Sequence, residues 1–180
     1  MSFPAPDWNQ FHIVSDLNSN KHGDAPRAIH TKDGIGDRLR AAAFAEIQAR
    51  DAFNWAADRF EDAAPELREA WRRLAKAEEK HLTWLLNRMK DLGIDVRERK
   101  VSDLLWRSLI GCTSAREFAL FMANSEERGR KAGERFSQAM AQIDPISAEI
   151  FGKIAEEEVE HIALAQRHFG SVTVERSMDL

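Results

Sequence analysis

The sequence predicts an all-α protein in which four long helices form a bundle of two antiparallel pairs joined by a long crossover. Apolar side chains recur at intervals of three and four residues over four long stretches, which is the spacing of one helix face. Glycine and proline are scarce, with 9 and 5 among 180 residues, and most of them fall between these stretches. The two halves of the chain also resemble each other, as expected when a helical hairpin is repeated.

The first helical hairpin is predicted to follow an irregular segment, residues 1–36, which is interrupted by three glycines and three prolines. Asp37 is a suitable N-cap for a first helix over residues 37–62, because its side chain can accept hydrogen bonds from the first turn. A second helix is expected to begin at Pro65, since proline suits the first turn. Gly93 is expected to end it.

The second hairpin follows a connection that is too long for a tight turn, residues 93–113. Residues 102–110 within it are predicted to form a short helix that Gly111 ends. Ser114 and Glu117 form a capping box, so a third helix is expected over residues 114–142. Asp144 and Pro145 then start a fourth helix that runs to about residue 169. The predicted domain is therefore residues 37–170, followed by a C-terminal tail, residues 171–180.

Bulk composition excludes several classes of protein. The net charge is −4, so a nucleic-acid partner is not expected. The single cysteine, Cys112, cannot form an internal disulfide or a Cys-x-x-Cys metal site. No apolar run approaches the roughly 20 residues that span a bilayer, and the first residues do not resemble a signal peptide. The expected location is the cytoplasm, without membrane contact.

The internal repeat identifies a candidate metal site. Glu78 and His81 are three residues apart, so they share one helix face, and Glu158 and His161 repeat this pair 80 residues later (158 − 78 = 80). The same offset relates two isolated glutamates on the first helix of each hairpin (126 − 46 = 80). The predicted ligands are Glu46, Glu78, His81, Glu126, Glu158 and His161.

These six residues interrupt stripes that are otherwise apolar, which places four carboxylates and two imidazoles in the core. Burying ionised carboxylates together is unfavourable unless cations balance their charge. Two divalent cations would balance four carboxylates. Ligands of oxygen and nitrogen without thiolate suit iron, with manganese as an alternative metal and zinc as a substitute.

Neighbouring charged residues have a simpler interpretation. Arg50 and Arg130 follow the isolated glutamates by one turn, so they either support the ligands or extend along the surface. Several glutamates lie off the centres of the stripes and are expected to be solvated: Glu79, Glu127, Glu156, Glu157 and Glu160.

The six residues and their spacing resemble the ferritin-like di-iron carboxylate proteins. The segments around Glu78 and Glu158 are similar to rubrerythrins and bacterioferritins, and other segments are closer to a bacterial ferritin-like family of undefined function. The resemblance covers about residues 37–169. It implies that Glu78 and Glu158 bridge two irons while Glu46 and Glu126 are terminal ligands.

The resemblance implies the fold and a di-iron site, and the leading hypothesis for the function is a di-iron oxidoreductase that activates O₂ or peroxide. One cysteine cannot build the cysteine-ligated iron module of a complete rubrerythrin, so a separate electron donor is expected. An iron-storage protein with ferroxidase activity and a tRNA-modifying di-iron hydroxylase are alternatives. A monomer or homodimer would favour the enzyme, whereas a cage of many subunits would favour storage.

Overall fold

The computed structural model describes residues 6–14 and 23–170, and most of these residues are helical, which confirms the predicted all-α class. The helices are α1 (Lys32–Arg59), α2 (Pro65–Asp91), α3 (Leu104–Ile110), α4 (Ala115–Met140) and α5 (Pro145–Phe169). Two short strands, β1 (His12–Val14) and β2 (Lys100–Ser102), complete the described structure. The predicted tail, residues 171–180, lies outside the described residues.

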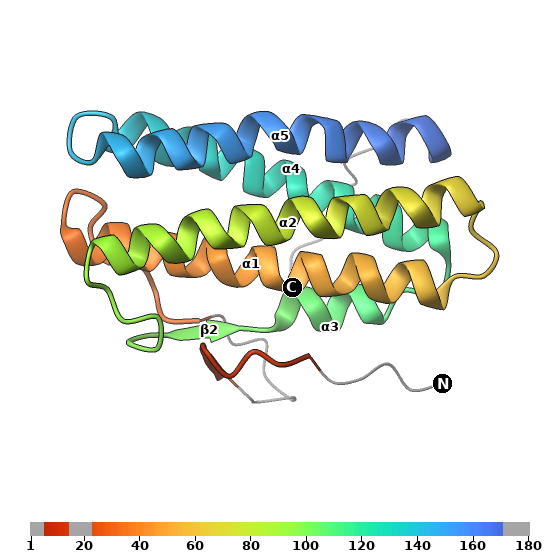
Figure 1. Cartoon of the computed structure of the whole chain (residues 1–180), viewed down its shortest axis with the longest axis horizontal. Helices are drawn as coiled ribbons and strands as arrows, with labels where there is room; N and C mark the ends of the chain where they lie inside the picture. Colours follow the sequence, from red (N-terminus) through yellow and green to blue (C-terminus); the bar gives the residue numbers. More distant parts are fainter. Residues whose placement is uncertain (1–5, 15–22, 171–180) are drawn as a thin grey trace.

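The four long helices lie side by side along the longest axis of the molecule (Figure 1). α1 packs along α2 and α4 packs along α5, and these are by far the most extensive contacts between elements. Each pair is antiparallel, and α3 lies against α1 on the side away from α2 (Figure 1). No helix in the described ranges is both long and apolar enough to cross a bilayer.

Three of the predicted helix starts are confirmed. α2 begins at Pro65. The Ser114 hydroxyl accepts a hydrogen bond from the Glu117 N–H at 3.1 Å, so it caps α4. The Asp144 carboxylate accepts one from the Ser147 N–H at 3.1 Å, so it caps α5. These caps satisfy amide groups that have no partner inside the helix.

The start of α1 was predicted wrongly. The helix begins at Lys32, and the Thr31 hydroxyl accepts the capping hydrogen bond from the Gly34 N–H at 3.0 Å. The glycines at this point predicted a loop. Gly34 is instead a helical residue that packs closely against the preceding segment, since a Cβ on it would lie 1.8 Å from the Ala28 carbonyl oxygen. Asp37 lies inside the helix and is buried, where it pairs with Arg27 at 2.8 Å and Arg40 at 2.9 Å.

Residues 1–36 are also less irregular than predicted in the part that the structure describes. β1 pairs in parallel with β2, which puts Ile13 opposite Val101. Trp8 is buried with its ring 5.3 Å from that of Phe44 on α1, in an edge-on arrangement. The described N-terminal segment is therefore packed onto α1 and the crossover.

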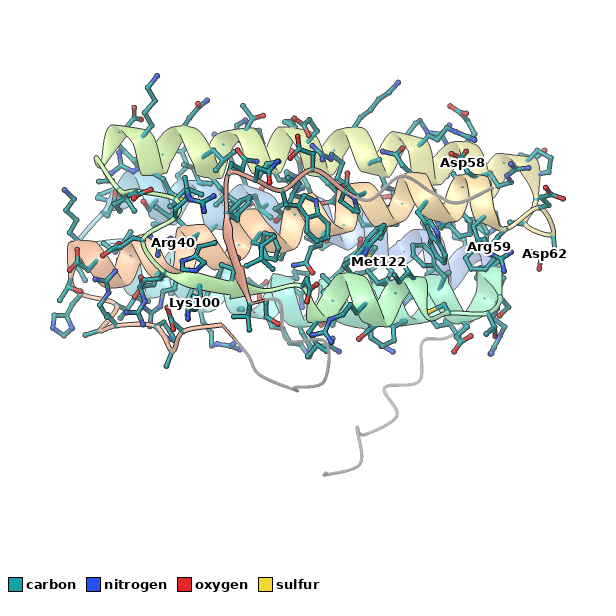
Figure 2. The ribbon with its side chains drawn as sticks, turned by 90° about the horizontal axis from the view of Figure 1, so that it is seen from below. Arg40, Asp58, Arg59, Asp62, Lys100 and Met122 are labelled. Atoms are coloured by element: carbon teal, nitrogen blue, oxygen red, sulfur yellow. The ribbon has the colours of Figure 1, made fainter. Side chains whose placement is uncertain are left out.

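One end of the helical core is filled by aromatic rings. Phe118 lies at the centre of this aromatic end, and its ring centroid is 5.3–6.1 Å from those of four others, Phe53, Trp55, Phe60 and Trp71. Figure 2 shows Met122, one turn further along α4, between the helices, and Asp58, Arg59 and Asp62 at the end of the molecule where α1 ends. Arg40 lies toward the opposite end, near β2. Tight aromatic packing thus closes one end of the interior.

Phe118→Ala should destabilise the protein by about 3–5 kcal/mol, because it removes a ring that is 0% exposed and contacts four others. Phe121→Ala is the matched control, since Phe121 lies on the same helix but is 37% exposed; its cost should not exceed about 1 kcal/mol. Chemical denaturation of both variants measures the difference. Equal costs would show that the aromatic end is not the tightly packed core described.

Candidate metal centre

All six predicted ligand side chains meet near the middle of the long helices. Glu46 comes from α1, Glu78 and His81 from α2, Glu126 from α4, and Glu158 and His161 from α5. None has more than 12% of its side chain exposed. The helical spacing predicted the shared face of each Glu–His pair, and the packing of the four long helices brings the six residues together. Their role as metal ligands stays a prediction.

The six residues form two overlapping groups. In each group the potential ligand atoms lie within 4.8 Å of one another. One group contains Glu46 and His81, the other contains Glu126 and His161, and both include Glu78 and Glu158. Each group offers one nitrogen and three oxygens, a donor set that suits iron or manganese and leaves coordination positions open. The sharing of two carboxylates is compatible with a dinuclear site.

Both histidines turn Nδ1 toward the carboxylates. The Nδ1 atom of His81 lies 3.5 Å from a Glu78 oxygen and 3.6 Å from oxygens of Glu46 and Glu158. The Nδ1 atom of His161 lies 2.9 Å from Glu78, 3.5 Å from Glu158 and 3.7 Å from Glu126. The two rings are nearly parallel, with centroids 5.9 Å apart and an interplanar angle of 20°.

Unsatisfied polar atoms are concentrated at this site. Among the described residues, six buried side-chain nitrogen or oxygen atoms lack a hydrogen-bond partner. Five of them belong to the cluster: Glu78 Oε1, His81 Nδ1, Glu126 Oε1, Glu158 Oε2 and His161 Nδ1. Glu78 Oε1 and His161 Nδ1 lie 2.9 Å apart but are not aligned for a hydrogen bond. Buried polar groups are normally satisfied, and a metal ion would satisfy these oxygens and nitrogens together. The donor set therefore fits a metal centre.

One family model matches this chain over residues 10–180, and its description is "Protein of unknown function (DUF455)". The chain belongs to this family. No curated protein and no solved structure matches the chain. The family match spans all six residues of the cluster, and its description assigns no activity.

Burial raises the pKa values of most carboxyl groups in the metal-free cluster. It raises the pKa of Glu126 to about 8, although the contact with His161 acts to lower it. Burial and the charge of Glu78 raise the pKa values of Glu46 and Glu158. Glu78 is the exception: burial acts to raise its pKa, but its contacts with Glu46 and His161 hold the pKa below its usual range. The cluster therefore concentrates its negative charge on Glu78.

The two imidazoles respond in the opposite way. Burial acts to lower the pKa of His81, but Glu46 and Glu78 raise it to about 10. Burial likewise opposes protonation of His161, whereas Glu126 and Glu158 raise the pKa of this residue well above its ordinary value. Without metal, protons thus neutralise the cluster at neutral pH. Metal binding must displace them, because the ligands coordinate in their deprotonated forms.

Glu157 belongs to the surroundings of the cluster, contrary to its prediction as a solvated residue. One of its oxygens lies 2.9 Å from Nε2 of His81 and 2.5 Å from Nζ of Lys80. A carboxylate on the second ring nitrogen fixes the orientation of a metal-binding histidine and makes it a stronger ligand. Residue 77, which is 80 positions earlier, is alanine, so the repeat gave no signal for this residue.

The two arginines considered as supports for the ligands contact other residues. Arg50 donates to Asp51 at 2.8 Å and to Glu79 at 2.5 Å. Arg130 donates to Glu127 at 2.7 Å and pairs with Glu134 at 2.6 Å. Within the described residues, neither arginine forms a hydrogen bond or ion pair with the six. Glu79 and Glu127 are thus partners in surface ion pairs.

Glu157→Ala should weaken metal binding by about 10- to 100-fold, because His81 loses the carboxylate that orients it. Glu156→Ala removes the same charge from the adjacent exposed position and should change affinity by less than about threefold. Competition with a chromophoric chelator measures both affinities. Equal losses would mean that only the overall charge matters, and that Glu157 has no orienting role.

Metal and pH should act together on stability. Raised pKa values of carboxyl groups and imidazoles favour the folded state at low pH, and this contribution is lost as pH rises through the folded pKa. The free energy of unfolding of the metal-free protein should therefore fall from about pH 5 to about pH 8, as Glu126 loses its proton, and fall further toward about pH 10 through His81. The depressed pKa of Glu78 changes the free energy of unfolding only below about pH 4.5, the ordinary pKa of a glutamate, so it does not affect this range.

Bound metal should reverse this trend, because deprotonation favours coordination. The increase in melting temperature on adding Mn²⁺ should therefore grow from pH 5 to pH 8. Thermal melting of metal-free and Mn²⁺-loaded samples across this range is the measurement. Parallel curves would argue against a metal centre built from these groups.

Proposed function

We propose that this protein is a ferritin-like four-helix bundle that holds a dinuclear metal centre and acts as an oxidoreductase on O₂ or peroxide. Two iron ions are the preferred metals, with manganese as an alternative and zinc as a substitute. The observation that carries the proposal is the set of five unsatisfied buried atoms within one cluster of four carboxylates and two imidazoles. The two antiparallel pairs and the internal repeat support the bundle.

The chain supplies a preorganised set of ligands for this chemistry. Glu78 and Glu158 belong to both groups and are therefore suited to bridge two metal ions. Glu46 and Glu126 each belong to one group and are suited to complete the coordination of one ion. When bound, two ferrous ions would supply electrons for reducing O₂ or peroxide. Glu157 holds the Nε2 side of His81, so that Nδ1 stays directed at the metal position.

Access to the cluster favours an enzyme over iron storage. A cavity of about 320 Å³ reaches all four glutamates of the cluster and is otherwise lined mainly by alanine, glycine and larger apolar residues. Apart from the four glutamates, its acidic lining residues are Asp24 and Asp37, which already have other partners. The rest of the lining therefore suits small molecules with apolar parts better than hydrated cations, whose paths are commonly marked by rings of acidic side chains. The electrons for repeated turnover must come from outside this part of the chain. Cys112 is the only thiol among the described residues, and it is buried. A separate reductant is therefore required.

His161→Ala should lower the metal content from two ions per chain and abolish oxygen-dependent turnover, because one group loses its only nitrogen ligand. His168→Ala makes the same change on the same helix at an exposed position outside both groups and should preserve both properties. Metal analysis after anaerobic loading with Fe²⁺, followed by measured O₂ uptake with an added reductant, tests the pair. Two metals per chain in His161→Ala would overturn the assigned ligand set.

The same samples separate the enzyme from the storage protein. The proposed enzyme binds two iron ions per chain, turns over repeatedly with reductant and remains a small assembly on size exclusion. Uptake of many iron ions per chain into a large cage would support storage and contradict the oxidoreductase proposal.

A further inference from the structure

The cavity that reaches the cluster is a cleft between α1 and α4. Its walls are built from small residues, with Ala41 and Ala45 on α1 facing Gly129 and Ala132 on α4. These two helices make few contacts compared with the partners within each pair. The cleft begins at the glutamates and extends toward Arg38, so it occupies the end of the interior opposite the aromatic one.

The internal repeat shows why only one end is open. The aromatic end is closed by Phe53 and Phe118, whose rings lie 6.1 Å apart. The residues equivalent to them by the offset of 80 are Gly133 (53 + 80) and Arg38 (118 − 80), and both line the cleft. On the aromatic side the cavity next to His161 measures only about 10 Å³, room for about one water at most. The replacement of two phenylalanines by Gly133 and Arg38 in the repeat therefore leaves one side of the proposed metal centre open to the cleft.

Arg38 gives the cleft a positive group. Its Nη1 donates to the carbonyl oxygens of Arg27 and Gly34, both at 2.7 Å, and its guanidinium lies 5.7 Å from the centre of the Phe136 ring. Its Nε is the sixth buried atom without a hydrogen-bond partner. Within the described residues, no carboxylate lies at ion-pair distance from Arg38.

Two acidic residues also line this end of the cleft, but each has another partner. The Asp37 carboxylate accepts hydrogen bonds from Arg27 and Arg40. The Asp24 carboxylate accepts one from the Lys100 N–H at 2.8 Å. The charged group still able to take a new partner at this end is therefore the guanidinium of Arg38.

The dimensions of the cleft set the size of a ligand. Arg38 precedes Glu46 by eight positions on α1, which corresponds to about 12 Å along the helix. The volume of about 320 Å³ equals that of about ten water molecules in the liquid. An elongated molecule of about ten non-hydrogen atoms would extend from Arg38 to the glutamates.

We propose that this cleft binds a linear apolar molecule with one carboxylate, which pairs with Arg38, and that the apolar end of the molecule lies against the metal centre. The small residues of α1 and α4, which are exposed or half-buried, line the cleft along its chain. The substrate class of the proposed oxidoreductase would then be a medium-chain carboxylic acid. This proposal rests on the proposed function for the role of the end that lies against the metal centre.

Decanoate, octanoate, hexanoate and the uncharged analogue decanol test the site by calorimetric titration of the full chain loaded with Mn²⁺. We expect one molecule of decanoate per chain, with affinity increasing about two- to fourfold for each added methylene. Decanol should bind at least tenfold more weakly. Arg38→Gln should remove this preference by weakening decanoate about tenfold while leaving decanol unchanged.

Variants that fill the cleft provide a second test. A Cβ on Gly129 would meet no atom within 4 Å, so Gly129→Leu places a side chain in open space, and Ala45→Leu fills the cleft from the other wall. Each should weaken decanoate at least tenfold. Ala139→Leu is the matched control on an exposed position of α4 outside the cleft and should bind as the unmodified chain does.

The outcomes separate this proposal from the metal centre itself. A chain that holds two metal ions but does not bind decanoate, or binds decanoate and decanol equally, overturns the ligand proposal and leaves the proposed oxidoreductase standing. Unchanged decanoate binding in both cleft-filling variants also overturns it. A chain that binds decanoate but takes up no metal overturns the proposed function and, with it, the placement of the apolar end against a metal.

Discussion

Mutual repulsion among four buried carboxylates is the constraint on which the rest of this structure depends. Glu46, Glu78, Glu126 and Glu158 approach one another from four different helices, and ionising them all without cations would be strongly unfavourable. Without metal, the raised pKa values of Glu46, Glu126 and Glu158 and of both imidazoles favour bound protons, which leaves Glu78 as the ionised carboxylate. Metal ions would meet this constraint with charge and coordination together. The long helices position the cluster in either case.

The duplicated hairpin supplies equal ligands but unequal surroundings. His81 has Glu157 on its outer nitrogen, whereas the residue 80 positions earlier, Ala77, has no carboxylate to offer His161. Phe53 closes the interior on one side, and its equivalent, Gly133, opens it on the other. The two groups of potential ligands therefore differ in the support of their histidine and in access, although the repeat makes their donor sets the same.

Much of the fold and of the cluster followed from local sequence patterns. Caps at Ser114 and Asp144 and the proline at the start of α2 set the helix boundaries, and the three-residue spacing of Glu78 and His81 placed both on the inner face. Two features depended on contacts that no local pattern encodes. Gly34 packs against the Ala28 carbonyl inside a helix, so it was mistaken for a loop residue. Three-residue strands far apart in sequence pair with each other, and their length gives no detectable alternation.

The surroundings of the cluster also link proton movement to access. Burial raises the pKa values of Glu46 and Glu126, which favours their protonated forms in the absence of metal, and both residues line the cleft. The aromatic end leaves almost no space for water beside His161, so protons that metal binding displaces leave most directly through the cleft. A ligand lying in the cleft would exclude water from this route. Filling the cleft would lower the dielectric around the carboxylates and so strengthen their interaction with a metal held there, and it would shield such a centre from solvent.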